Sequence, residues 1–460
     1  MSWRSYVQAL ASTTRRLKDR LLKILNWWDL MWFGVGSIMG AGIFVLTGEA
    51  ARNESGPAVV VSYFISGISA MLSAGGLFSY LRVELGDFVA YIAAGNILSE
   101  YMVSGASVAW SWTSYFATLF ASLAKNCNHL DPIAVAVSVA VCVGASLSMK
   151  GSSRLNLFAA IVICLTKPDP TNMTNFAPYG IRGILKASSV LFFAYVGFDG
   201  MATLGEEVKI PAYCVLAATL CLMQPFSVAF QAAGMDWAKY IVAIGALKGM
   251  TTVLQDNLIG QARYFTHIAR THMAPPILAA INKRTGTPVN AMVIMTIANS
   301  IIVLFTSLEV LANLLSVSTL FIFSLVSAAL IVRRNKLLAF LALIIGSSTG
   351  SAVYWKASKK GWIGYVVTVM IWFLATLSLK LTVKEARKPK KLGVPLVPWL
   401  PSASIAINVF IMGSIDGPSF LRLILWMILL LAYYLVVTLH ASYDATKLRW
   451  TKDQLLLLEQ

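Results

Sequence analysis

Four glycines fall within residues 34–43, which read Gly-Val-Gly-Ser-Ile-Met-Gly-Ala-Gly-Ile inside an apolar run. Each glycine weakens a helix by about 0.8–1.0 kcal/mol relative to alanine, so a break in the middle of this span is predicted. A break inside a membrane leaves amide N–H groups at the start of one half-helix and carbonyl oxygens at the end of the other. These groups suit the carboxylate and the ammonium of an amino acid. Close helix packing through small residues is the alternative explanation.

A second interrupted span covers residues 189–202 and reads Ser-Val-Leu-Phe-Phe-Ala-Tyr-Val-Gly-Phe-Asp-Gly-Met-Ala. Gly197 and Gly200 flank an acidic residue, Asp199, within apolar surroundings. Paired interruptions in two parts of a chain are typical of transporters built from inverted repeats. A carboxylate inside a membrane is costly and therefore indicates a functional site.

Glu100 is a second acid within an apolar run, four residues after Asn96, so the two side chains share one helix face. Together, Glu100 and Asp199 place two carboxylates near a site for an amino-acid head group. That combination predicts a substrate with a cationic side chain. For Glu100 the alternative is a structural acid that is hydrogen-bonded to a neighbouring helix.

The composition predicts a membrane protein. The chain has 460 residues, of which 58% are hydrophobic and 12% charged, and apolar runs of about 20 residues recur along it. The net charge of +17 comes from basic residues between these runs, which is the positive-inside pattern rather than a nucleic-acid module. No metal-ligand spacing, phosphate loop or catalytic triad is present, so we expect neither an enzyme nor a cofactor.

The elements that must position these residues are helices. Apolar runs predict them at 30–47, 57–77, 86–120, 131–149, 181–203, 237–262, 288–306, 310–332, 337–355, 362–381, 397–414 and 418–440. Two further runs, 156–165 and 211–223, are much shorter than the ~20 residues that a crossing needs.

Longer motifs resemble a known family. They include GVGSIMGAGIFVLTGEAA, YLRVELGDFVAYIAAGNILSE, LFFAYVGFDGMATLGEEVK, GQARYFTHIARTHMAPP and GVPLVPWLPSASIAINVF. The chain resembles the cationic amino acid transporters, most closely the plant branch, within the amino acid–polyamine–organocation (APC) superfamily. This resemblance implies an all-α polytopic membrane protein with an APC/LeuT-type fold: inverted five-helix repeats plus additional C-terminal helices.

On that basis the chain divides into five parts. These are a cytosolic basic N-terminus (1–29), a first inverted repeat with helices 1–5 (30–165), a second with helices 6–10 (181–332), additional C-terminal helices (333–440) and a cytosolic tail (441–460).

The resemblance also implies a substrate-binding site. The first broken helix of the family matches Ile38 to Ile43 of this chain, including Gly40. The resemblance implies that the amides around Ala41, Gly42 and Ile43 hold the substrate carboxylate. The carbonyls of Phe193, Ala194 and Val196 would hold the α-ammonium, with Phe193 as a gate over the site. Asp199 and Glu100 match acids that face the side-chain pocket.

The chain departs from the family pattern at three places. Residues 73–77 join directly where the end of helix 2 and its link to helix 3 are expected. Most of helix 5 is missing near 156–165, and most of helix 7 near 211–223. The sequence therefore predicts an internally truncated version in which the helix 2/3 link, helix 5 and helix 7 are incomplete.

The resulting expectation is a secondary transporter of cationic amino acids (arginine, lysine, ornithine) that works by alternating access. It would be proton-coupled or driven by the membrane potential, and would lie in the lipid bilayer of the plasma membrane, with the vacuolar membrane as the alternative. A truncated regulator or amino-acid sensor that does not transport remains an alternative function, as does a mis-spliced, inactive product. No nucleic-acid partner is expected.

Overall fold

The structure is a computed structural model that describes residues 46–72, 81, 85–119, 132–147, 176–192, 236–270, 274–282, 287–331, 337–357, 363–382 and 397–438. All regular elements in these residues are helices. The predictions for the two short runs, 156–165 and 211–223, and for the junction at 73–77 fall outside the described residues.

The predicted helices that fall within the described residues are largely confirmed. The helix predicted at 30–47 lies almost entirely outside these residues, as does the second half of the one predicted at 181–203. Their bounds are α3 (Thr47–Ala50), α4 (Val59–Leu72), α6 (Asp87–Leu119), α7 (Pro132–Leu147), α9 (Gly180–Leu191), α12 (Asp236–Arg270), α13 (Val289–Phe305), α14 (Leu308–Ile331), α15 (Leu337–Ala357), α16 (Ile363–Thr382), α17 (Trp399–Met412) and α18 (Gly417–Tyr433). Short π- or 3₁₀-helical turns, η2 (Ala51–Ser55), η3 (Gly56–Ala58), η9 (Pro276–Ala279) and η10 (Tyr434–Thr438), adjoin several of them.

One predicted boundary is wrong. The sequence placed the end of the 237–262 helix where its apolar run stops, but α12 continues to Arg270. A helix can outlast its apolar stretch because backbone hydrogen bonds do not depend on side-chain polarity. Pro275 and Pro276 follow shortly afterwards, and proline disfavours helical geometry in the residue before it.

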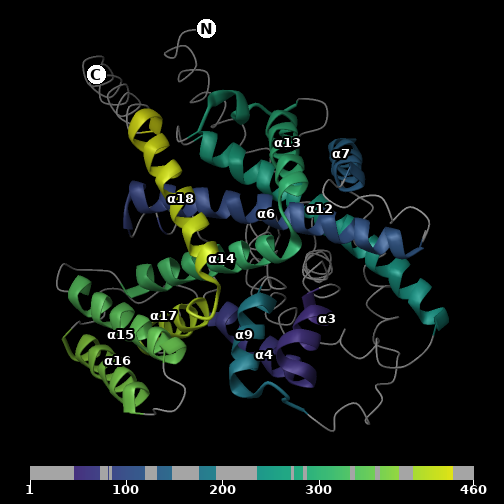
Figure 1. Cartoon of the computed structure of the whole chain (residues 1–460). Helices are drawn as coiled ribbons and strands as arrows, with labels where there is room; N and C mark the ends of the chain where they lie inside the picture. Colours follow the sequence, from purple (N-terminus) through teal and green to yellow (C-terminus); the bar gives the residue numbers. More distant parts are fainter. Residues whose placement is uncertain are drawn as a thin grey trace, which may run out of the picture.

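Helix α6 lies at the centre of the described fold (Figure 1). It contacts α7, α12, α13, α14 and α18, and residues 90–101 on it are all buried. Helices α15, α16 and α17 pack together on one side, and α17 joins them to α14 and α4 (Figure 1). The hydrophobic core therefore surrounds α6, with a smaller cluster beneath the C-terminal helices.

Three described helices are long and apolar enough to cross a membrane, namely Leu308–Ala329, Ile363–Thr382 and Gly417–Val437. Large apolar side chains are exposed along α16 and α18, for example Val367, Leu374, Leu425 and Leu429. Exposed leucine and valine on the outside of a helical bundle are expected where lipid is the solvent. The arrangement is that of a polytopic membrane protein.

Candidate functional site

Only one of the predicted binding residues, Glu100, lies within the described residues. The others fall outside them: Ile38, Gly40, Ala41, Gly42, Ile43, Phe193, Ala194, Val196 and Asp199. The site is therefore built from Glu100 and from the helices that adjoin the two predicted breaks.

Glu100 lies in the interior of α6, and its side chain is only 3% exposed. Asn96, one turn earlier, is fully buried, and its Nδ2 donates to the carbonyl of Ile92 (2.8 Å) and contacts Sδ of Met427 on α18 (3.0 Å). Ser104, one turn later, is also buried. The helix thus presents a buried column of polar side chains in which the acid is central.

The partner of this column is α12, which runs antiparallel to α6. Asn257 Nδ2 donates to Ser104 Oγ at 2.9 Å, and the Tyr101 ring lies 3.5 Å from the place where a Cβ would stand on Gly260. Further along, Trp112 Nε1 donates to Thr251 Oγ1 at 3.1 Å. Residues later in α6 therefore contact residues earlier in α12, as expected for two antiparallel helices.

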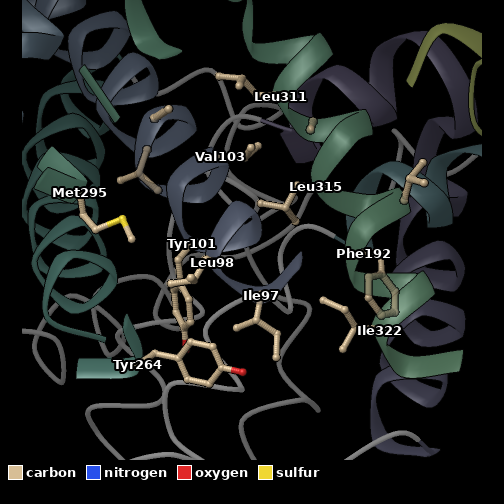
Figure 2. Close-up of a cluster of buried hydrophobic side chains, with 14 of the residues drawn as sticks. Ile97, Leu98, Tyr101, Val103, Phe192, Tyr264, Met295, Leu311, Leu315 and Ile322 are labelled. Atoms are coloured by element: carbon tan, nitrogen blue, oxygen red, sulfur yellow. The ribbon is translucent and has the colours of Figure 1, made fainter. Parts of the chain in front are cut away.

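That register places Gln261 of α12 at the level of Glu100. We call Glu100, Tyr101, Ser104, Asn257 and Gln261 the α6–α12 seam. The rings of Tyr101 and Tyr264 also meet across it, with centroids 6.4 Å apart (Figure 2). The side chains of Glu100, Tyr101, Ser104, Asn257 and Gln261 are all buried.

The segments next to the two predicted breaks lie against each other. Helix α3 begins at Thr47, four residues after Ile43, and α9 ends at Leu191, two residues before Phe193. The two helices are in contact. Two hydroxyls of α4 strengthen the arrangement, because Ser62 Oγ donates to the Ile184 carbonyl (2.8 Å) and Ser66 Oγ to the Ser188 carbonyl (2.7 Å) of α9.

The last described residue of this segment, Phe192, anchors it to the core. Phe192 is fully buried and meets Phe323 of α14 edge to face, with ring centroids 5.6 Å apart. Figure 2 shows Phe192 beside the ribbon of α14. This contact fixes the C-terminal end of α9 against α14.

Opposite charges join the middle of α9 to η2, the segment after α3. Lys186 Nζ lies 2.7 Å from Glu54 Oε1 of η2, and the Ala58 amide donates to the Phe176 carbonyl at 2.8 Å. Arg182 of α9 lies over the ring of Trp355 on α15, 5.1 Å from its centroid. Helix α9 is thus tied to η2 and to the C-terminal helices.

Sequence reasoning missed the α12 side of this site. The sequence pattern alone assigns no role to Asn257 or Gln261 of α12, or to Asn299 of α13. The available signal was spacing: Asn257 and Gln261 are four residues apart, like Glu100 and Ser104, so each pair shares a helix face. That the polar face of α6 lies against the polar face of α12 could be seen only from the register of the two helices in the structure.

Comparisons with known proteins show which proteins this chain is similar to. A family profile described as the C-terminus of AA_permease matches residues 392–442. The chain is 51% identical to "Cationic amino acid transporter 1" of Arabidopsis thaliana, over 98% of this chain and 92% of the relative. It is 44% identical to "Cationic amino acid transporter 8, vacuolar" of the same plant, over 96% and 91%.

A more distant relative is the "Methylthioribose transporter" of Bacillus subtilis, 28% identical over 76% of this chain and 92% of the relative. All three relatives are named as transporters. Identity of 51% across nearly the whole length shows that this chain belongs to the plant cationic amino acid transporters, a family of membrane transporters and not of enzymes.

Proposed function

We propose that the chain is a secondary transporter of cationic amino acids such as arginine, lysine and ornithine. The observation that carries the proposal is the buried acid Glu100 in the interior of α6, the central helix. A carboxylate held inside a membrane bundle is costly, and a cationic side chain of the substrate offsets that cost.

The proposed site has three parts. The amides around Ala41, Gly42 and Ile43, within the stretch from Ile38 through Gly40, bind the substrate carboxylate. The carbonyls of Phe193, Ala194 and Val196 bind the α-ammonium, and Phe193 closes over it. Glu100 and Asp199 face the side-chain pocket. What supports this placement is the contact between α3 and α9, which adjoin the two stretches in the chain.

Transport would follow alternating access, in which the two interrupted helices rock against a set of helices that keeps its position, called the frame. The seam between α6 and α12 is a candidate for the frame, because its polar and aromatic contacts fix the register of two long helices. The hydrogen bonds of α4 to α9 would make these two helices move together.

The driving force would be the membrane potential or a proton gradient. Entry of one lysine moves one positive charge, which a potential of 100 mV favours by about 2.3 kcal/mol. We propose the plasma membrane as the site of action, with the vacuolar membrane as the alternative, since one relative is named as vacuolar. Imaging of a fluorescent fusion of the full chain distinguishes the two.

The test is uptake of radiolabelled lysine into proteoliposomes that contain the full chain. Hydrogen bonds to charged groups contribute about 1.5–3 kcal/mol. The ratio kcat/KM for lysine should therefore fall about tenfold or more in Glu100→Gln. Glu309→Gln is the matched control, because Glu309 is an exposed acid in the first turn of α14. Equal uptake by both variants would remove Glu100 from the pocket.

A second candidate function is a truncated membrane protein that binds amino acid as a regulator or sensor without transporting it, or an inactive mis-spliced product. One observation favours it: the alignment with the first Arabidopsis relative runs over 545 positions, whereas the chain has 460 residues. The relative therefore has material without a counterpart here. A short run such as 156–165 is too short to cross a membrane, because a helix of about ten residues spans only ~15 Å of a ~30 Å hydrocarbon layer.

Uptake by the natural chain and by a restored version separates the two functions. The restored version carries family-like segments at 73–77, 156–165 and 211–223. Uptake by both chains supports the transporter. Uptake by the restored chain alone, with the natural chain still binding lysine, supports the sensor, and loss of binding as well supports the inactive product.

A further inference from the structure

Two amide side chains, one in the α6–α12 seam and one on the adjoining helix α13, are buried without a hydrogen-bond partner. Gln261 of α12 and Asn299 of α13 are both fully buried. Neither the oxygen nor the nitrogen of either amide makes a hydrogen bond within the described protein. Most buried polar groups in proteins are paired, so two unpaired amides in one region require an explanation.

The two amides flank the same part of α6. Gln261 lies at the level of Glu100 by the antiparallel register set by Asn257 and Ser104. The amide of Asn299 packs directly against Gly105, where a Cβ would clash with Nδ2. Helices α6, α12 and α13 are in mutual contact. Both amides therefore belong to one three-helix junction, within about a turn and a half of each other along α6.

Each unpaired amide is costly, because it has lost its hydrogen bonds to water without replacing them. The chemistry of an amide restricts what can restore those bonds, since it presents both a donor and an acceptor. A cation would satisfy only the oxygens and an anion only the nitrogens. Water satisfies both, and internal waters typically bridge such groups in proteins.

We propose that the junction of α6, α12 and α13 holds internal water, bound by the amides of Gln261 and Asn299 at the depth of Glu100. Water there also lowers the cost of keeping a carboxylate inside a membrane bundle, because it supplies hydrogen bonds that lipid cannot. The proposal concerns the resting protein and stands whether or not the chain transports amino acids.

Radiolytic labelling tests it on the full chain in nanodiscs. An X-ray pulse makes hydroxyl radicals from bound water, and these oxidise adjacent side chains, which mass spectrometry then identifies. Tyr101 and Tyr264 of the junction are reporters, with side chains 4% and 8% exposed. Tyr63 of α4, which is only 3% exposed, is the matched control outside the junction. Oxidation of Tyr101 and Tyr264 several-fold faster than Tyr63 is expected; equal rates would overturn the proposal.

Substitution then assigns the water to the two amides. In Gln261→Leu with Asn299→Leu, oxidation of Tyr101 should fall to the rate of Tyr63, while Tyr63 itself is unchanged. Oxidation of Tyr101 that stays at the natural rate would contradict binding by these amides. A faster oxidation of Tyr63 would indicate that the double variant has lost its fold. The single variant Gln261→Met, which keeps the side-chain length, then supplies the same comparison between Tyr101 and Tyr63.

Discussion

Single hydroxyl groups fix the depth of one helix against another in this molecule. Ser62 and Ser66 of α4 both donate to main-chain carbonyls of α9 rather than only to their own helix. Because the acceptors are backbone atoms, the bonds set the axial position of α9 independently of its side chains. Hydrogen bonds between membrane helices contribute on average about 0.6 kcal/mol, with a maximum near 1.7.

Replacing one of these hydroxyls should therefore have a measurable effect. Ser66→Ala removes a bond of 2.7 Å to the Ser188 carbonyl, and we expect the free energy of unfolding to fall by about 0.5–1.5 kcal/mol. The control is Ser138→Ala, because Ser138 is equally buried but donates to Ala134 within its own helix. Thermal unfolding in detergent measures both. Equal shifts in the two midpoints would contradict a cross-helix contribution from Ser66.

At the scale of elements, α9 approaches η2 so closely that a glycine is required. A Cβ on Gly183 would overlap the backbone carbonyl of Glu54, which has no flexible end to move aside. It would also lie 2.5 Å from Cβ of Tyr179. The ion pair between Lys186 and Glu54 lies next to this contact. Glycine thus permits the close approach, and the charges contribute a smaller part, about 0–1 kcal/mol for an exposed pair.

Gly183→Ala should accordingly separate α9 from η2 and destabilise the protein by about 1–3 kcal/mol, the usual cost of overpacking. Gly346→Ala is the control, since Gly346 is also helical but nothing lies within 4 Å of its built Cβ. There alanine should be neutral or stabilise by up to about 1 kcal/mol. Hydrogen exchange measured by mass spectrometry should rise in η2 and α9 only for Gly183→Ala. An unchanged exchange rate there would refute the steric argument.

The elements were predictable from the sequence, but their pairing was not. Apolar runs of α6, α7 and α13 gave helix bounds close to those observed, because a membrane helix must be apolar along most of its length. The same argument misplaced the end of α12, where polar residues extend the helix to Arg270. Burial of Glu100 followed from its apolar neighbours. The position of Gln261 opposite it depends on helix register, which no single helix encodes.

At the scale of the whole molecule, a polar network joins the C-terminal helices to the rest. Asn408 of α17 accepts a hydrogen bond from Ser69 of α4 and donates to Ser404 Oγ at 3.3 Å. Ser327 of α14 donates in turn to Ser404 at 2.9 Å. All four side chains are fully buried. One amide therefore connects α4, α14 and α17, while α15 and α16 pack on α17.

Asn408→Ala should uncouple the C-terminal helices from the bundle around α6. The substitution removes the hydrogen bonds that join Asn408 to Ser69 and to Ser404, and each such bond contributes about 0.5–1.5 kcal/mol to stability. Because α15 and α16 reach the bundle largely through α17, we expect hydrogen exchange to rise across α15–α17 and to stay constant in α12. Asn290→Ala is the control, since Asn290 is exposed and donates only to Ile277 near the surface. A uniform rise over all helices would indicate general destabilisation instead, and would show that the network does not act as a local connection.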